Sequence, residues 1–355
     1  MSRIAAVAPV VPENRYDQAT ITAAFAEVVL PDPSDRRVLE RLHEATGVRT
    51  RHLALPLEDY PALDGFGAAN DVFIRVGTDL GEKAVSEALA AAGLEPRDVD
   101  VLLVSSVTGI AAPSLDARLV PRLGLRTDVR RVPVFGLGCV AGAAGIARVH
   151  DYLRGDPDGV AVLLTVELCS LTVQRSDDSM PNLVASGLFG DGAAAVVMVG
   201  ERRAVAMGLD SAPQVVRTLS RFYPDTERVM GWDIGGSGFR IVLAASVADV
   251  VEENLGEDVR GFLEGNDLKT ADIGRWIAHP GGPKVLHAMQ RALAVPEGAF
   301  DLTWASLADV GNLSSASVLH VLAATLQQPP PEPGSHGVLM AMGPGFCAEL
   351  VLIRW

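Results

Sequence analysis

A single cysteine, Cys139, stands among glycines where an apolar run meets a helix-like stretch. Val132–Phe135 has the pattern of a strand, Gly136 and Gly138 permit a sharp turn, and the small residues that follow suit a closely packed helix. This pattern predicts a cysteine at a helix N-terminus, where the helix dipole and free backbone N–H groups favour the thiolate that attacks acyl groups. The same pattern also fits a small buried hydrophobic residue, which is the commonest role of a free cysteine.

Two further side chains of catalytic type, His279 and Asn312, also lie where a predicted strand gives way to a helix. In an α/β sheet, binding and catalytic sites form at the carboxyl ends of the strands. Residues at strand-to-helix junctions can therefore lie close together even when they are far apart in the sequence. With Cys139 they form a nucleophilic set, in which histidine stabilises the thiolate and the asparagine amide donates to a developing oxyanion. Each also has an ordinary alternative, because His279 precedes a proline as turn residues do and Asn312 precedes a helix as a cap does.

Composition limits the fold and the classes of partner. The 355 residues are 48% hydrophobic and only 5% aromatic, which favours a soluble α/β protein with two core-forming halves. The net charge of −14 argues against nucleic acid as a partner. Cys139, Cys169 and Cys347 lack the spacing of a zinc site or a disulfide framework, so we expect no metal and reduced thiols in the cytoplasm. We expect no targeting signal and no membrane span.

The predicted elements of the first half alternate between strands and helices, as an α/β fold requires. The expected strands are Ile4–Val10, Val99–Val107, Val132–Phe135, Val160–Val166 and Ala193–Val199. The expected helices are Gln18–Val29, Asp35–Glu44, Asn70–Ala92, Arg118–Leu123, Val140–Leu153 and Leu183–Phe189.

The apolar pattern breaks at 201–203, which predicts a boundary between a first half, 1–203, and a second half, 204–355. Strand-turn-strand endings in both halves indicate an internal duplication, although no residue-level repeat supports it. The expected elements of the second half are a strand from about Ala204, the helix Phe239–Asn254, the strand Gly274–Ala278, the helices Lys284–Leu293 and Ser314–Gln327, and the strands Val338–Met342 and Cys347–Ile353.

Five segments carry the three candidates and their surroundings. They are Gly138–Gly142, Gly187–Ala194, Trp276–Pro283, Gly311–Ser317 and Gly343–Phe346. In this order, over nearly the whole chain, they resemble the signatures of type III polyketide synthases, the chalcone-synthase-like branch of the thiolase superfamily. The resemblance implies a five-layered αβαβα fold built from two similar halves, a homodimer, and independence from acyl carrier protein.

The resemblance also implies a role for each candidate. Cys139 would hold the starter and the growing chain as a thioester, while His279 and Asn312 would bind the malonyl thioester carbonyl during decarboxylation. Loss of CO₂ from malonyl-CoA leaves an enolate whose charge two preorganised donors stabilise, and the enolate then attacks the acyl group on the cysteine. The expected substrates are acyl-CoA and malonyl-CoA, with no cofactor beyond these coenzyme A thioesters.

Further positions align with the substrate channel of the family. Phe189 and Phe239 resemble two gatekeepers between the CoA tunnel and the cavity, with core packing as the alternative. Arg49 and Arg51 fall where the family binds CoA phosphates, which guanidinium forks suit, with a solvated surface as the alternative. Ala341-Met342 departs from the Gly-Phe of many plant members, which leaves the local cavity shape open. The aligned cavity residues are Val107, Thr108, Cys169, Thr172, Met230, Ser314, Gly343, Pro344 and Gly345.

The segments 166–171 and 223–232 resemble bacterial enzymes that extend fatty acyl-CoA starters into alkylpyrones or alkylresorcinols. Valine, cysteine and methionine at the aligned positions favour a cavity more apolar than one built for a phenolic starter. We therefore predict a medium-to-long acyl starter with two or three malonyl extensions. Starter length, the number of extensions and the mode of ring closure stay open.

Other enzyme classes share the cysteine, histidine and asparagine set. A ketoacyl synthase of the fatty-acid initiating type uses the same residue types, but the runs 279–283 and 311–317 favour the polyketide branch. A papain-like cysteine hydrolase has the same residue order, but its cysteine lies near the mature N-terminus, whereas Cys139 follows a large α/β region. Retention of all three side chains disfavours a third alternative, a binding homologue without catalysis.

Overall fold

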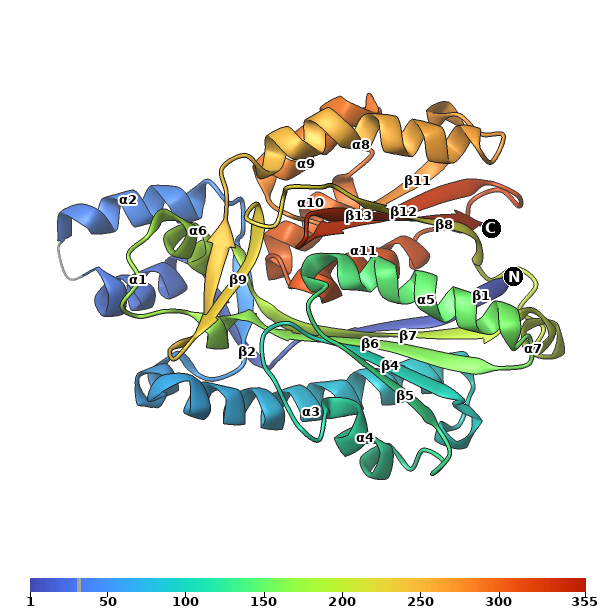
Figure 1. The fold of residues 1–355 in the computed structure, drawn as a ribbon, viewed down its shortest axis with the longest axis horizontal. Helices are drawn as coiled ribbons and strands as arrows, with labels where there is room; N and C mark the ends of the chain where they lie inside the picture. The colour runs from blue at the N-terminus through green and yellow to red at the C-terminus, as the bar shows by residue number, and fades with distance from the viewer. Residues whose placement is uncertain (31–32) are drawn as a thin grey trace.

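The computed structural model describes residues 1–30 and 33–355 and has a mixed α/β fold (Figure 1). Its strands are β1 Ser2–Val10, β2 Asn14–Asp17, β3 Thr50–Leu53, β4 Val101–Ser105, β5 Arg130–Val134, β6 Val160–Leu168, β7 Asp191–Gly200, β8 Gln214–Phe222, β9 Met230–Gly235, β10 Gly238–Leu243, β11 Ile273–Ala278, β12 His336–Gly343 and β13 Cys347–Arg354. Its α-helices are α1 Gln18–Val29, α2 Pro33–Glu44, α3 Gly65–Ala92, α4 Leu115–Leu123, α5 Ala141–Gly155, α6 Met180–Leu188, α7 Glu201–Ala206, α8 Val247–Glu264, α9 Pro283–Leu293, α10 Asp301–Val310 and α11 Ser317–Leu326. Its 3₁₀ turns are η1 Leu57–Ala62, η2 Pro96–Asp98, η3 Gly138–Val140, η4 Cys169–Thr172, η5 Thr270–Asp272 and η6 Ser314–Ala316.

In the described ranges, one large sheet contains strands from both halves of the chain, in the order β11-β12-β13-β8-β1-β7-β6-β4-β5. β1 pairs along its length with β7, but it meets β8 only through Ser2 and Arg3. The two halves of this sheet therefore separate over most of their length. The short pairs β9-β10 and β2-β3 lie outside it.

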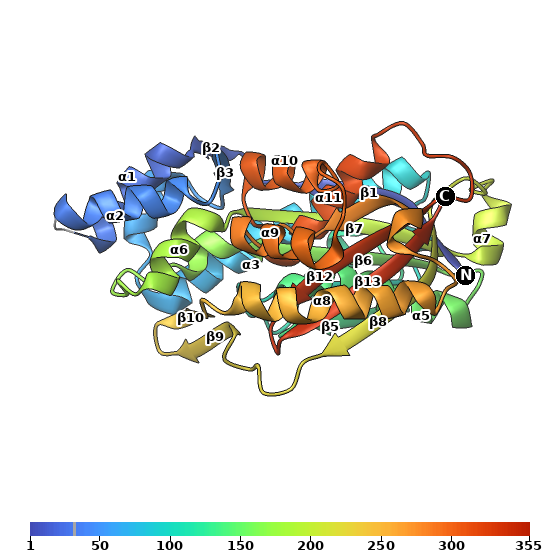
Figure 2. The same cartoon turned by 90° about the horizontal axis from the view of Figure 1, so that it is seen from above.

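Helices cover both halves of the sheet and fill the space between them. In Figure 1, α8 and α9 lie above the strands of the second half, α5 and α11 lie in the middle, and α3 and α4 lie below the strands of the first half; Figure 2 shows α8 to α11 from above. One apolar cluster packs α5 and α11 against both halves of the sheet, through residues such as Ile146 and Leu319. Separate clusters bury α3 beneath the first half and α8 with α9 above the second. This layering confirms the predicted αβαβα fold.

Most predicted elements are present, but the region after 200 differs from the prediction. The strand expected from Ala204 is wrong, because Glu201–Ala206 is the helix α7. The helix expected over Phe239–Asn254 is also wrong, because its first residues form β10, paired with β9, and α8 begins only at Val247. Pairing with β9 overrides the helical spacing of the apolar residues. This contact is local, because only Gly236 and Ser237 separate the two strands, and such a glycine-containing turn is a hairpin signal.

The described ranges, 1–30 and 33–355, contain no helix that is both long and apolar enough to cross a membrane. The predicted boundary at residue 203 falls inside α7 and stays a prediction.

Candidate active site

Cys139 lies in a tight turn at the start of a central helix. The 3₁₀ turn η3 carries it, and α5 begins at Ala141. Gly138 has a φ of 56°, and a Cβ atom there would lie 2.6 Å from Cδ of Pro344, so glycine is required. The loop 343–345, which the sequence assigned to the cavity, therefore packs directly on the Cys139 turn.

The Cys139 thiol is almost fully buried, with 6% of the residue exposed. Its Sγ lies 3.6 Å from Oγ of Ser314 and can donate a hydrogen bond to that hydroxyl. Burial raises the pKa of the Cys139 thiol to about 12, although the contact with Ser314 lowers it. Desolvation therefore outweighs the thiolate stabilisation expected from a helix N-terminus, and the resting side chain is a neutral thiol.

Asn312 lies close to Ser314 and has a fixed orientation. The predicted strand before it is wrong, because the helix α10 precedes it and ends at Val310. Its Oδ1 accepts a hydrogen bond of 2.8 Å from the backbone N–H of Ser314, which turns the Nδ2 donor group the other way. Its own backbone N–H donates to Leu188 O at 2.9 Å, and its carbonyl accepts from Gly190 N at 3.0 Å. These bonds place Asn312 beside Phe189, with which it forms an isolated parallel bridge.

His279 follows β11 and is also buried. Its backbone N–H donates to Met340 O at 2.9 Å, so the end of β12 fixes its position. Gly282, in the turn that follows, packs against Leu188, whose carbonyl binds Asn312. Burial lowers the pKa of His279 to about 3, so the imidazole is neutral. Nδ1 of His279 is buried and has no hydrogen-bond partner among the described residues.

Glu167, at the end of β6, is a buried carboxyl group that the sequence analysis did not select. It accepts hydrogen bonds from Val107 N at 3.1 Å, from Oγ1 of Thr108 at 3.0 Å and from Oγ of Ser315. Burial raises its pKa to about 7, although these hydrogen bonds lower it. An acidic residue at the carboxyl end of a fully buried strand was a usable signal. Glu167 ties the loop after β4 to the turn that carries Ser314.

A cavity of about 730 Å³ lies beside these turns. Five predicted channel residues line it, and they are Arg51, Cys169, Thr172, Phe189 and Phe239. In the part of the chain that the structure describes, the other predicted cavity residues and Cys139 do not line it. These other residues are Val107, Thr108, Met230, Ser314, Gly343, Pro344 and Gly345. The cavity therefore ends near the two phenylalanines, and the cysteine lies outside its lining.

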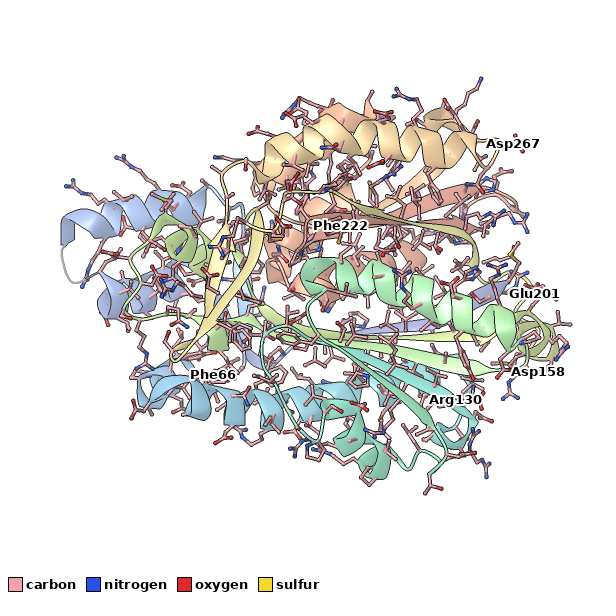
Figure 3. The ribbon with its side chains drawn as sticks, viewed as in Figure 1. Phe66, Arg130, Asp158, Glu201, Phe222 and Asp267 are labelled. Carbon is pink, nitrogen blue, oxygen red and sulfur yellow. The ribbon has the colours of Figure 1, made fainter. Side chains whose placement is uncertain are left out.

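Phe239 is the centre of an aromatic group at one end of the cavity. Its ring centroid lies 5.4 Å from that of Phe66 in an edge-to-face arrangement and 5.9 Å from that of Trp232. Phe135, which precedes the Cys139 turn, lies 6.4 Å from it by the same measure. Figure 3 shows Phe66 at the end of α3 that faces β9. Phe66 and Trp232 also line the cavity, so Phe239 connects its wall to the segment that carries the nucleophile.

The two arginines predicted to bind CoA occupy different environments. Arg49 is exposed and forms an ion pair with Asp309, whose carboxylate lies 2.5 Å away. Arg51 is only 3% exposed and donates to the carbonyls of Ser186 and Phe189 at 2.6 and 2.8 Å. This burial favours a structural role for Arg51 at the Phe189 turn, while CoA binding by either arginine stays a prediction.

Comparison with known proteins places the chain in a family. Residues 1–202 match the N-terminal domain of chalcone and stilbene synthases, and residues 214–355 match the C-terminal domain. A 1,3,6,8-tetrahydroxynaphthalene synthase from Streptomyces peucetius subsp. caesius is 57% identical over 355 residues, which cover 99% of this chain and 93% of that protein. The chain belongs to the type III polyketide synthases.

This type III polyketide synthase is also similar to proteins of more distant sequence. A crystal structure of 1,3,6,8-tetrahydroxynaphthalene synthase from Streptomyces coelicolor A3(2) superposes with a TM-score of 0.92 at 32% identity, covering 99% of each chain. A Mycobacterium tuberculosis protein named alpha-pyrone synthesis polyketide synthase-like Pks18 is 30% identical over 96% of this chain and 88% of its own length. The family assignment confirms an enzyme of the acyltransferase class and removes the papain-like hydrolase as an alternative.

The geometry of the synthase supplies the groups that acyl condensation needs. A buried thiol contacts a hydroxyl, and an asparagine with an oriented amide lies two residues before that hydroxyl. His279, a neutral histidine, follows strand β11. Neutral donors in a site without bulk water are suited to an enolate oxygen, because they need no reorganisation when the charge appears.

Proposed function

We propose that this synthase condenses malonyl-CoA units on Cys139 and releases 1,3,6,8-tetrahydroxynaphthalene. The observation that carries the proposal is 57% identity, over almost the full length of both chains, to a protein with that name. Two further proteins of the same name, from Streptomyces coelicolor and Streptomyces griseus, are 35% and 31% identical. The starter would then be a malonyl group as well.

The proposed reaction begins with acyl transfer to Cys139. The Sγ atom attacks the thioester carbonyl of the starter, the C–S bond to CoA breaks, and the proton of the buried thiol passes to the CoA thiolate. Because Cys139 rests as a thiol, this transfer needs the CoA leaving group as the final proton acceptor. Ser314, 3.6 Å away, is positioned to keep the Sγ atom oriented during the attack.

Decarboxylation of the extender supplies the carbon nucleophile. We assign the N–H groups of His279 and Asn312 to the thioester oxygen of malonyl-CoA, where negative charge develops as CO₂ leaves. The enolate carbon then bonds to the acyl carbon on Cys139, and the Cys139 thiolate departs. The neutral state of His279 suits this role, because an imidazole N–H donates without first taking up a proton.

The acyl starter predicted from the sequence is the second candidate. The apolar residues Ile21, Phe25 and Val28 of α1 line the same cavity and would suit an alkyl chain. We retain a fatty acyl-CoA starter and an alkylpyrone or alkylresorcinol product as that alternative.

A homodimer is the predicted assembly, and we place its contact at β5. This strand is the last in the sheet order, and its side chains, Val132 among them, are mostly exposed. Phe135, just after the strand, is 49% exposed. A second copy could pair with this edge and cover both side chains. The cytoplasmic location stays a prediction.

Product analysis tests the proposed function directly. The purified enzyme is incubated with malonyl-CoA alone, and then with malonyl-CoA plus acyl-CoA starters of increasing length. We expect tetrahydroxynaphthalene from malonyl-CoA alone, identified by mass and ultraviolet spectrum. Turnover only when an acyl-CoA is added would contradict this proposal and support the alkyl alternative.

A further inference from the structure

Two hydroxyl groups stand next to each other on the wall of the 730 Å³ cavity. Tyr60 comes from η1 and Ser170 from η4, immediately after the predicted cavity residue Cys169. The Oη atom of Tyr60 lies 2.5 Å from the Oγ atom of Ser170. One hydroxyl therefore donates a hydrogen bond to the other, and both residues line the cavity.

A carboxyl group lies behind this pair. Asp191, the first residue of β7, has an exposure of 0% and accepts a hydrogen bond from Oγ of Ser170. It also accepts from the backbone N–H groups of Ser170 at 2.8 Å and Ala54 at 2.6 Å. Asp191 does not line the cavity among the described residues, but its hydrogen bond to Ser170 connects it to the cavity wall.

The protons of this chain have a defined direction. An ionised carboxylate only accepts hydrogen bonds, so the Ser170 hydroxyl donates to Asp191 and the Tyr60 hydroxyl donates to Ser170. When Asp191 is protonated, every donor reverses, and the Tyr60 hydroxyl proton then points towards the cavity. The chain can therefore take up one proton at Tyr60 and later return it there.

Opposing influences on Asp191 keep both protonation states accessible. Burial raises the pKa of Asp191 to about 6, whereas its hydrogen bonds and the nearby Arg51 guanidinium lower it. Cys169 and Tyr60 also face this cluster, and burial raises the pKa of each, which keeps both neutral. The cluster therefore contains one cation, Arg51, and one group that exchanges a proton near neutral pH.

We propose that Tyr60, Ser170 and Asp191 form a proton relay that drives carbon–carbon ring closure of the polyketide chain inside the cavity. The inference rests on the proposed function, because a chain built only from malonyl units carries ketone groups along its length. A methylene group between two ketones is acidic, and its enolate is the nucleophile for ring closure.

The step balances without an additional reagent. Tyr60 accepts the methylene proton while its own proton moves to Ser170 and the serine proton moves to Asp191. The enolate carbon forms a bond to a ketone carbon further along the chain, and the C=O electron pair moves to oxygen. The relay then reverses, and Tyr60 donates its proton to that alkoxide. No electron is exchanged with an external acceptor, and Asp191 ends as a carboxylate.

The test separates ring closure from chain extension. Ser170→Ala interrupts the relay, Ser170→Thr restores a hydroxyl, and Tyr60→Phe removes the group that meets substrate. Tyr152→Phe is the matched control, because Tyr152 lies on α5 and its hydroxyl bonds to Asp156 away from the cavity. Each enzyme receives malonyl-CoA alone. Released CoA measures condensation, and mass spectrometry gives the ratio of carbocyclic products to lactones.

We expect Ser170→Ala and Tyr60→Phe to lower the carbocycle-to-lactone ratio at least about tenfold, and by a larger factor than they lower CoA release. Ser170→Thr should recover most of the ratio, and Tyr152→Phe should leave it unchanged. An unchanged ratio in both relay variants, or a parallel loss of CoA release and carbocycle, would overturn the relay alone. A native enzyme that makes only lactones from malonyl-CoA would overturn the proposed function as well, so the two failures are distinguishable.

Discussion

The turns that carry the reacting groups and the walls of the cavity are held in different ways. Cys139, His279 and Asn312 lie in turns that follow β5, β11 and α10, and backbone hydrogen bonds and close glycine contacts fix these turns. The cavity walls come from α1, η1, η4, α6 and the β9-β10 hairpin, and side chains make many of their contacts. A rigid frame suits chemistry that every condensation repeats, whereas side-chain walls can change with the substrate while the frame stays intact.

The first way to test this contrast is to remove the nucleophile. Cys139→Ala deletes one sulfur atom from a packed turn, so we expect the fold to persist and condensation to fall at least about 10³-fold. CoA release with malonyl-CoA measures the loss, and mass spectrometry of the protein checks for a covalent acyl group. Cys347→Ala, on β13, is the control and should keep its activity. Acylation of the Cys139→Ala protein would show that another residue is the nucleophile.

A second substitution tests the amide of Asn312 apart from its structural bond. Asn312→Asp keeps the Oδ1 acceptor for Ser314 N and replaces the amide donor with a carboxylate oxygen. We expect malonyl decarboxylation to fall roughly 10²- to 10³-fold, because the enolate loses a donor and meets a negative charge. Acylation of Cys139 by the starter should fall much less, and protein mass spectrometry measures it. Equal loss of both steps would contradict the assignment of Asn312 to decarboxylation.

The two regions also differ in how well the sequence predicts them. The Cys139 and His279 turns have glycine-rich local patterns at strand-to-helix junctions, whereas Asn312 lies between the helices α10 and α11. The layered fold follows from alternating buried strands and helices. Burial raises the pKa of the Cys139 thiol, against the thiolate predicted from the helix N-terminus. The sequence did not reveal this burial, because it depends on contacts with distant residues such as Ser314 and Pro344.

The cavity walls were harder to predict because a strand pairing that overrides helical spacing and a contact between distant residues create them. Phe239 has helical spacing with later residues, yet its pairing with Ile234 places it on a strand. Tyr60 and Ser170 are 110 positions apart, and neither belongs to a motif with an evident chemical role. Only the folded chain brings their hydroxyls together.

A third prediction concerns Glu167, beside the turn that carries Ser314, and the pH dependence of folding stability. Burial raises the pKa of Glu167 from 4.5 to about 7 in the folded protein, so the folded state holds a proton that the unfolded state has released. The stabilisation of the folded state by this bound proton is fully present below about pH 4.5 and is lost as pH rises towards 7. Relative to Glu167→Gln, the native enzyme should lose roughly tenfold to a hundredfold in its folding equilibrium over this window.

Urea denaturation of both proteins at pH 5 and pH 8 measures this difference. The comparison with Glu167→Gln cancels the titration of other carboxyl groups, because they are common to both proteins. A stability difference that does not vary with pH would contradict the raised pKa of Glu167.

A fourth substitution tests whether the part of the cavity wall formed by the β9-β10 hairpin determines which starter the enzyme uses. Trp232→Ala removes a large ring beside Phe239 and enlarges the cavity. We expect the ratio of kcat/KM for a long acyl-CoA starter to that for malonyl-CoA alone to rise roughly tenfold. Ile234→Ala is the control, because Ile234 is on the same strand but exposed. If both variants shift the ratio equally, the effect comes from a loosened hairpin and not from cavity size.

The smallest expected effect is at the exposed Arg49. Its ion pair with Asp309 lies three residues before Asn312, so a CoA phosphate that binds there must compete with the Asp309 carboxylate. Exposed charge pairs contribute little free energy, and we expect Arg49→Ala to raise the KM for malonyl-CoA only about twofold to fivefold. Asp309→Ala frees the guanidinium and should lower KM by a similar factor at low salt, with kcat unchanged in both variants. Because salt screens exposed charges, both effects should shrink as ionic strength rises. A KM that moves in the same direction in the two variants would show that the ion pair supports the Asn312 turn and does not bind CoA.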